Sequence, residues 1–209
     1  MIESNLKYFS NHLLQINNTN LSLGDPTLTV SDHVANGSFK SLKENVKIFD
    51  QPNYSLFIRN IDFKNGIHGN LKYVDKKTYA FLKKSHLRKG DVVISNVGDV
   101  GSVHRVPMLN TPMVVGNNEI FIHSEVPQVN DYLYSFFKSF VGQRMIQSIT
   151  SGSAQQKFNK TDFRKLSISL PSVSWIDTNI SNYLALTDNI YLENRALNSI
   201  KLNLIKQLI

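Results

Sequence analysis

Cysteine is absent from the 209-residue chain. Its absence excludes a disulfide framework, a thiolate metal site and a cysteine nucleophile, and it favours a cytosolic setting. Long apolar runs are also absent, since no stretch approaches the roughly 18 residues that a membrane-spanning helix needs. Glu3 follows Met1 closely, where a signal peptide would place basic residues and then an apolar segment. We therefore expect a cytoplasmic protein that does not contact a membrane.

Motifs of the common enzyme classes are missing too. The chain has no Gly-x-x-x-x-Gly-Lys-Ser/Thr phosphate loop and no Gly-x-Ser-x-Gly nucleophile turn. None of the six histidines forms a pair at the i, i+4 spacing of a helical zinc site. Asp91 and Asp99 flank a hydrophobic segment without the third acid that a metal-dependent nuclease usually needs. The sequence predicts a protein with no catalytic residues, no metal and no cofactor.

The spacing of apolar residues predicts a mixed α/β (α+β) fold, with a globular body over residues 1–171. Apolar residues at helical spacing predict helices over 5–16, 75–87 and 130–149. Asp75 and Asp131 are the expected N-caps of the last two. Apolar runs predict strands over 54–63, 92–97, 103–109 and 112–124, and a last strand that ends at Pro171. The segments 92–97 and 103–109 would form a hairpin, and the polar residues 35–41 would form a flexible turn.

The composition changes after Pro171, and we assign 172–209 to a separate helical region. Residues 176–209 contain neither proline nor glycine, so they predict a helix roughly 50 Å long. Counted from Ile176, every seventh residue of this helix is apolar. These candidate dimerisation residues are Ile176, Tyr183, Ile190, Leu197 and Leu204. A single apolar stripe needs a covering surface. Either the helix folds back onto its own body, or it pairs with a second copy.

Positive charge is concentrated in one part of the chain. The formal net charge is +7 and the isoelectric point about 9.5. Residues 36–90 hold twelve Lys/Arg against four Asp/Glu, a local charge of +8, so the rest of the chain sums to −1. Such an imbalance favours an acidic partner such as nucleic acid. The alternative is a solvated lysine surface without a partner.

Two segments combine cations with amides, "NGSFKSLK" (36–43) and "SAQQKFNK" (153–160). Lysine and arginine bind phosphates, and they can also contact guanine. Asparagine and glutamine can pair with adenine. The alternative for Gln155 and Asn159 is that they bond backbone groups of their own loop. Arg59 could equally be an internal hydrogen-bond hub.

Four segments, taken in order, resemble the target recognition domain of specificity subunits of type I restriction–modification systems. They are "VANGSFKSLKENV" (34–46), "FIRNIDF" (57–63), "YAFLKKSHLRKGDVVISNVGDVGSVHRVP" (79–107) and "GSAQQKFNKTDFRKLSISLP" (152–171). The final helix, with "LALTDNI" (184–190), resembles the helical spacer of that family. The resemblance implies a non-catalytic subunit that binds double-stranded DNA. It also implies that the subunit directs a methyltransferase (M) subunit and a restriction (R) subunit to a bipartite target.

The charge distribution and the resemblance together give the candidate DNA-binding residues. Those expected to contact phosphates or bases are Lys40, Lys43, Arg59, Lys157 and Lys160. Further candidates for base contacts are Asn36, Ser41, Asn96, Gln155, Gln156 and Asn159.

The chain departs from the family pattern in two ways. It has one recognition domain and one long helix, half the usual complement, which implies a half-subunit that forms a homodimer. It also has "SVSWIDTNI" after Pro171, where the family commonly has Glu-Gln. The alternative function is that of an interaction protein, which binds the methyltransferase subunit and alters or blocks its targeting.

Overall fold

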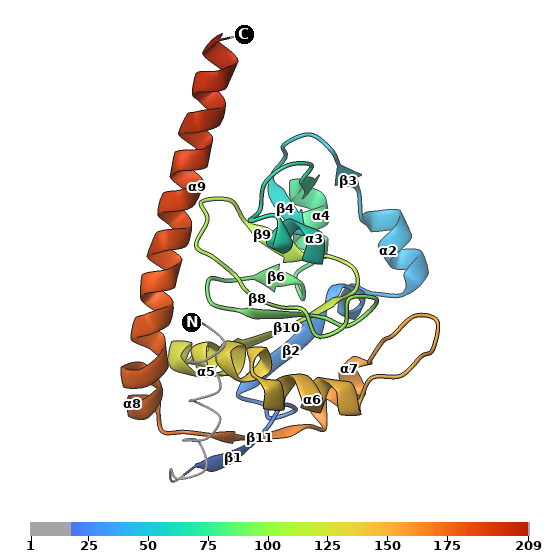
Figure 1. Cartoon of the computed structure of the whole chain (residues 1–209). Coiled ribbons are helices and arrows are strands. Elements are labelled where there is room, and N and C mark those ends of the chain that lie inside the picture. Colours follow the sequence, from blue (N-terminus) through green and yellow to red (C-terminus); the bar gives the residue numbers. More distant parts are fainter. Residues whose placement is uncertain (1–17, 209) are drawn as a thin grey trace.

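The computed structural model describes residues 18–208, so the helix predicted over 5–16 lies outside the described residues. The chain forms a mixed α/β body with one long helix along its side (Figure 1). The fold class predicted from the sequence is confirmed. The strands form three sheets, in the orders β1-β11, β2-β10-β7-β8 and β3-β5-β4-β9-β6.

The central sheet has four strands, and both of its faces are buried. It consists of β2 (Leu28–Asp32), β10 (Glu119–Ser124), β7 (Val92–Ser95) and β8 (Val103–Arg105). Val92 and Ile94 lie in one core cluster, while Val93 lies in the other. Alternate side chains of a strand point to opposite faces. The first three residues of β7 are therefore all apolar, because the strand has no solvent-facing side.

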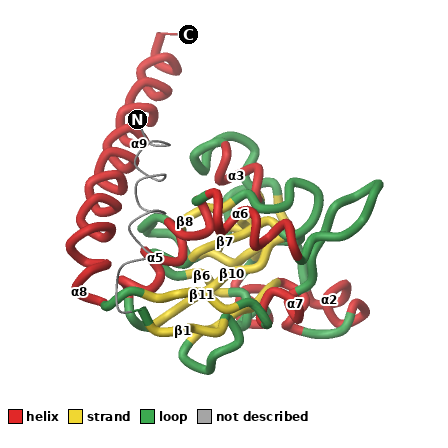
Figure 2. The backbone as a smooth tube through the Cα atoms, turned by 60° about the horizontal axis from the view of Figure 1, so that its bottom comes forward, coloured by secondary structure: helices red, strands yellow, loops and turns green. Residues whose placement is uncertain are grey.

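The two faces of the central sheet are covered by different elements. Helices α5 (Pro127–Lys138) and α6 (Phe140–Ser148) pack in one core cluster, which includes Leu133, Phe137 and Ile146. The second, five-stranded sheet contributes to the other cluster. Its strands are β3 (Ile48–Phe49), β5 (Lys72–Val74), β4 (Ser55–Ile58), β9 (Met113–Val115) and β6 (His86–Leu87). The third sheet pairs β1 (Thr19–Ser22) with β11 (Ser167–Leu170) at one end of the body (Figure 2).

Several predicted elements are confirmed. β7 and β8 form the expected antiparallel hairpin, in which Val93 pairs with His104. The Asp75 side chain caps α4 (Lys76–Phe81) by accepting a 2.7 Å hydrogen bond from the Thr78 N–H. The last strand is β11, which follows the short helix α7 (Lys160–Arg164).

Three boundaries were predicted wrongly. The strand expected over 54–63 ends at Ile58, because α3 (Asn60–Lys64) begins two residues later. The helix expected over 75–87 ends at Phe81, so His86 lies on a strand instead. The turn expected over 35–41 is η2 (His33–Asn36) followed by α2 (Phe39–Asn45), and each has a side-chain cap, from Asp32 and Ser38.

The helix predicted over 130–149 is two helices that meet at Ser139. Ser139 ends α5 and caps α6 by accepting a hydrogen bond from the Gly142 N–H. A Cβ on Gly142 would lie 2.1 Å from the Phe136 carbonyl oxygen, so only glycine permits this sharp change of direction. Asp131 lies inside α5, where it is buried and does not act as a cap.

The long C-terminal helix is confirmed, and it packs on the body only through its first part. It runs through α8 (Val173–Ile176), the π-helical turn η3 (Asp177–Ser181) and α9 (Asn182–Leu208). Ile176, Ile180 and Leu184 are buried in the main core. Beyond them α9 projects past the body (Figure 1). The domain boundary at 171/172 remains a prediction.

Arg105 joins this helix to the body. Its guanidinium lies 2.7 Å from an Asp131 carboxylate oxygen of α5, and it also pairs with Asp188 of α9. Only 13% of the Arg105 side chain is exposed. Three elements, β8, α5 and α9, therefore share one buried cation.

Replacing Arg105 with alanine should lower the free energy of unfolding by about 3 kcal/mol, because the buried Asp131 and the half-buried Asp188 carboxylates lose their partner. Urea denaturation followed by circular dichroism measures this change. The matched control is Arg88→Ala, since the Arg88–Glu125 ion pair is exposed on both sides. The control should leave the urea midpoint unchanged. Equal effects of the two substitutions would contradict the structural role of Arg105.

Candidate DNA interface

Eleven of the twelve cations of segment 36–90 fall into two groups, and the twelfth, Lys89, lines a hollow beside α9. Four of them are held in ion pairs: Arg59 with Asp62, Lys64 with Asp99, Lys72 with Asp50, and Arg88 with Glu125. Seven exposed lysines on or next to α2 and α4 have no ion-pair partner within residues 18–208. We call them the lysine face: Lys40, Lys43, Lys47, Lys76, Lys77, Lys83 and Lys84.

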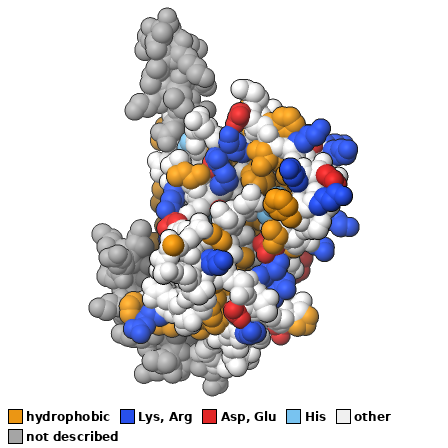
Figure 3. Space-filling model, turned by 90° about the vertical axis from the view of Figure 1, so that its right-hand side faces the viewer, with side chains coloured by type: hydrophobic (Ala, Val, Ile, Leu, Met, Phe, Trp, Pro, Cys, Tyr) orange, Lys and Arg blue, Asp and Glu red, His pale blue; other side chains and the backbone are white. Residues whose placement is uncertain are grey.

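The two helices of the lysine face are held together by hydrogen bonds. The Thr78 hydroxyl donates to the Asn45 carbonyl and accepts from the Lys47 N–H, at 3.2 Å each. Figure 3 shows the side of the molecule that carries α2, where Lys and Arg side chains gather with apolar side chains between them. This side lies opposite α9 (Figure 1). Fixed, unpaired cations on one surface create a positive potential that attracts phosphates.

A groove of about 730 Å³ lies beside α2, and we call it the amide groove. Phe39 and Lys43 of α2 line one side of it. Asn96 and Asn118, from the turns that end β7 and precede β10, line the other. A second hollow of about 320 Å³ shares Asn118 and extends to Arg59. The groove therefore brings amide side chains next to the lysine face.

The second cation-rich segment lies against the same groove. The Asn96 side-chain amide donates a 3.0 Å hydrogen bond to the Phe158 carbonyl. Lys160 pairs with Asp32, the residue that caps η2, at 2.8 Å. Segments 36–43 and 153–160, more than a hundred residues apart, are thus joined in space, as a shared binding surface requires.

The loop between Ser151 and Lys157 is tightly closed. These two residues exchange backbone hydrogen bonds of 2.9 Å in both directions. Gly152 has a φ of +99°, and a Cβ there would lie 2.4 Å from the Gln155 carbonyl oxygen. The loop therefore presents the side chains of Gln155, Gln156 and Lys157 to solvent.

The eleven candidates from the sequence separate into exposed residues and residues with internal bonds. The exposed candidates without a side-chain partner given by the structure are Lys40, Lys43, Gln155, Gln156 and Lys157. Ser41 is half-buried on α2, where its side chain lies near Gly37. The candidates that make internal bonds are Asn36, Arg59, Asn96, Asn159 and Lys160.

Arg59 is the internal hub that the sequence left open as an alternative. Its guanidinium forms two hydrogen bonds with Asp62, of 2.9 and 2.7 Å, and a third of 3.0 Å with the Asn70 carbonyl. Asn36 has a similar structural role, because its amide bonds the Ser85 hydroxyl at 2.6 Å and the Lys84 N–H at 2.8 Å. Arg59 and Asn36 therefore hold the backbone around the proposed interface in place.

Sequence reasoning missed two amides and an aromatic residue. Asn117 and Asn118 are exposed in the groove, but the Gly-Asn-Asn pattern indicated only a turn. Phe39 was noted only as part of a polar segment. The positive φ of 70° at Asn118 fits a residue type that tolerates the left-handed region, which explains the turn but not the groove.

Glu119 lies next to these amides, and its carboxyl is buried with only 3% of the residue exposed. One carboxyl oxygen accepts a 2.8 Å hydrogen bond from the Asn60 N–H. The other is buried without a hydrogen-bond partner among the described residues. Burial, with the nearby Asp62 carboxylate adding to it, raises the pKa of Glu119 to about 7.

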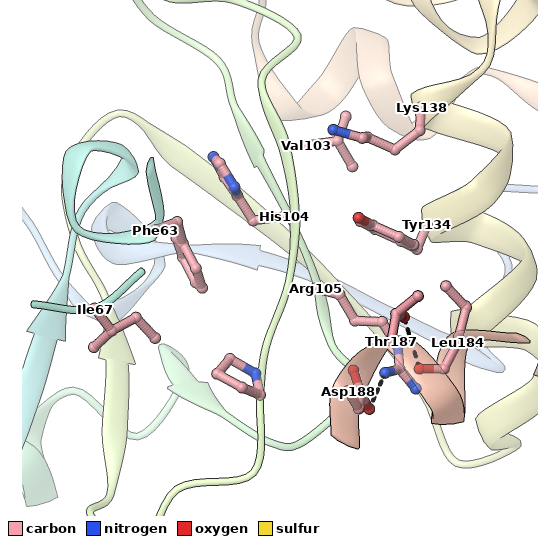
Figure 4. Close-up of a pocket in the computed structure, with 11 residues that line it drawn as sticks. Phe63, Ile67, Val103, His104, Arg105, Tyr134, Lys138, Leu184, Thr187 and Asp188 are labelled. Carbon is pink, nitrogen blue, oxygen red and sulfur yellow. Dashed lines mark hydrogen bonds and ion pairs between the residues drawn. The ribbon is translucent and has the colours of Figure 1, made fainter. Parts of the chain in front are cut away.

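A separate cavity, of about 270 Å³, lies between the body and the C-terminal helix (Figure 4). His104 stacks on Phe63 with ring centroids 4.8 Å apart, and burial lowers its pKa to about 4. Arg105 lies on the other side, bonded to Asp188. The polar groups here join elements of the fold, so this cavity is a structural junction.

Residues 18–208 contain neither a metal site nor a membrane-spanning helix. No group of three or more His, Asp or Glu side chains in that range is placed to hold a metal ion. Asp91, considered above as a nuclease ligand, is buried and bonds the Arg88 N–H and His123. No helix in the same range has both the length and the apolar character needed to span a bilayer.

Comparison with known proteins identifies the family. Residues 34–202 match the type I restriction modification DNA specificity domain, and the chain belongs to this family. The family predicted from the sequence is therefore confirmed. A comparison with curated proteins finds no match.

Solved structures of low sequence identity share the fold. The HsdS subunit from Thermoanaerobacter tengcongensis has a TM-score of 0.54 at 15% identity, with 93% of this chain and 46% of that chain covered. A structure described as bearing on complex assembly and conformational transition of the type I R-M system has a TM-score of 0.52 at 15% identity, with 93% and 48% covered. The S subunit from M. genitalium has a TM-score of 0.47 at 16% identity, with 92% and 43% covered. This chain thus spans less than half the length of each.

The pKa of Glu119 gives a prediction about stability and pH. A carboxyl whose pKa is about 7 in the folded state and 4.5 otherwise binds its proton more tightly when folded. The free energy of unfolding should therefore fall as the pH rises from 4.5 to 7. The loss should be on the order of 2–3 kcal/mol when complete above pH 7.

Glu119→Gln tests this prediction because it keeps the oxygen that accepts from Asn60 and removes the titration. Urea unfolding of both proteins at pH 4 to 8 should show the difference in stability moving in favour of the variant as the pH rises. His104 acts in the opposite direction, but it contributes equally to both proteins. A constant difference across this range would contradict the buried carboxyl.

Proposed function

We propose that this chain is the DNA-binding specificity subunit of a type I restriction–modification system and binds duplex DNA through the lysine face and the amide groove. The observation that carries the proposal is the cluster of seven exposed lysines without ion-pair partners among the described residues, next to a groove lined by amides. Family membership supports it.

The chemistry of the surface suits duplex DNA. Lysines bind phosphates without regard to sequence, so they supply affinity and orientation. Asn117 and Asn118, with the exposed Gln155 and Gln156 of the neighbouring loop, are amides that can pair with base edges in the major groove. Affinity and sequence selectivity would therefore come from adjacent but separate side chains.

The remaining parts of the proposal concern partners. The chain would act in the cytoplasm, and it would contribute no catalytic residue. It would direct an M and an R subunit to the DNA. The outer side of α9 supports pairing with a second copy. Tyr183, Leu186, Ile190, Leu197 and Ile200 are all between 46% and 63% exposed. Their spacings of three, four, seven and three residues fit a coiled-coil seam, in which Glu193 occupies the position between Ile190 and Leu197.

Two of the five dimerisation candidates need separate comment. Ile176 is fully buried in its own body, so it cannot contact a partner. The π-helical turn over Asp177–Ser181 has more residues per turn than an α-helix, which moves Ile176 out of line with the seam. The side chain of Leu204 lies outside the described part of α9.

In such a homodimer each copy would bind one half of an inverted repeat, and the paired helices would set the gap between the halves. Helices α2 and α9 lie on opposite sides of the body (Figure 1), so duplex DNA and a second copy could be bound at once.

The DNA contact is tested by Lys40→Ala/Lys43→Ala in a salt titration of binding to the target duplex. Removing two phosphate contacts should reduce the slope of log K against log salt by about 2, and the affinity at low salt roughly tenfold. The control Lys89→Ala/Lys138→Ala also removes two exposed lysines without ion-pair partners among the described residues, but these line hollows beside α9. An unchanged slope, or an equal change in the control, would contradict the proposed surface.

The pairing is tested by light scattering. The chain should be a dimer, and Ile190→Glu/Leu197→Glu should yield monomers, because charges in an apolar seam lose hydration without gaining a partner. Asn194→Glu/Ala196→Glu adds two charges to the same helix at exposed positions outside the seam, and it should leave most of the dimer intact. A dimer that survives the first pair of substitutions would have another interface.

A further inference from the structure

Phe39 is the most exposed of the large apolar side chains described, with 85% of its surface accessible. It is the first residue of α2, and it lines the amide groove together with Val34 and Ile48, which are 63% and 47% exposed. Three exposed apolar side chains therefore border one polar groove.

The fold does not need Phe39. Leu42, with 8% of its surface exposed, is the side chain through which α2 packs on the core. Ser38 supplies the cap of the helix by accepting from the Ser41 N–H. An apolar side chain left in water does not stabilise the folded state. Three exposed apolar side chains at one groove therefore indicate a bound partner.

The surroundings of Phe39 indicate what kind of partner this is. Lys40 and Lys43 lie on the same helix, and both are exposed without an ion-pair partner among residues 18–208. An apolar protein surface would gain little from these cations, whereas duplex DNA has phosphates to match them. In the major groove of DNA, the one apolar group on a base-pair edge is the 5-methyl group of thymine.

We propose that the Phe39 ring contacts the 5-methyl group of a thymine in the target half-site, and that Phe39 is thereby a specificity-determining residue. The inference rests on the proposed DNA-binding function. The amides of Asn117 and Asn118 line the same groove, where they can donate hydrogen bonds to neighbouring base edges or accept hydrogen bonds from them.

Phe140 offers a matched control elsewhere in the chain. It is the first residue of α6, a serine caps its helix too, and 72% of it is exposed. The Arg144 guanidinium lies 5.5 Å from the centre of its ring. Phe140 does not line the amide groove, so its removal should not affect base selection.

The experiment selects binding sites from a randomised duplex pool, with the full chain alone and with its modification subunit. The wild type, Phe39→Ala, Phe39→Leu and Phe140→Ala are compared. We expect Phe39→Ala to lose the preference at one T·A pair and to keep the others. Phe39→Leu, which retains an apolar side chain, should largely preserve that preference, and Phe140→Ala should select the wild-type sequence.

Deoxyuridine at the relaxed position then tests the methyl contact itself. Removing this methyl group should weaken wild-type binding about fourfold, and Phe39→Ala binding hardly at all. The thermal midpoints of the variants should match that of the wild type, since neither ring is buried.

Two outcomes would overturn the inference. Phe39→Ala could select the same sequence as the wild type, with the same selectivity. Alternatively, deoxyuridine could leave wild-type binding unchanged at every thymine. Failure of the proposed function is distinguishable, because in that case the wild type itself would select no sequence.

Discussion

Burial of the central sheet on both faces is the constraint on which the rest of the structure depends. β7 and β10 place apolar side chains alternately into two cores, so neither strand has a surface on which to display functional groups. Polar side chains can appear only where the strands end. Asn96 follows β7 and Asn118 precedes β10. Because these two strands are antiparallel, both residues lie at the same end of the sheet. The amide groove lies at this end.

Electrostatics then separates the structural cations from those that we propose to bind DNA. Arg59, Arg105 and Lys160 are paired with carboxylates and hold elements together. The lysines of α2 and α4 have no such partners within residues 18–208. Unpaired cations close together repel one another, a cost that binding of a polyanion would relieve. The net charge of the sequence thus understates the asymmetry of the surface.

The sequence predicted the parts of the fold that depend on local pattern. The β7–β8 hairpin, the Asp75 cap and the long C-terminal helix follow from alternation, a capping residue and the lack of Gly and Pro. It failed where a tertiary contact overrides a local pattern. Ser139 divides a run of helical periodicity because Gly142 packs against the Phe136 carbonyl, and no period in the sequence reports that contact.

The residues of the proposed DNA interface were also predicted only in part. Lys40 and Lys43 were found from charge, and both are exposed. Lys160 was predicted in the same way, and Arg59 was left open between a DNA contact and an internal hub. Their carboxylate partners, Asp32 and Asp62, become visible only in the fold. Phe39 was overlooked because it lies in a segment predicted to be a polar turn, and its exposure depends on which face of α2 packs inward.

Amine-reactive footprinting of the lysines, with and without bound target duplex, tests the central claim most directly. Labelling followed by mass spectrometry reports each lysine separately. We predict that DNA protects Lys40, Lys43 and Lys47 and their neighbours on α4, while Lys138 and Lys165 keep their reactivity. Unchanged reactivity across the lysine face, with protection elsewhere on the molecule, would contradict the account.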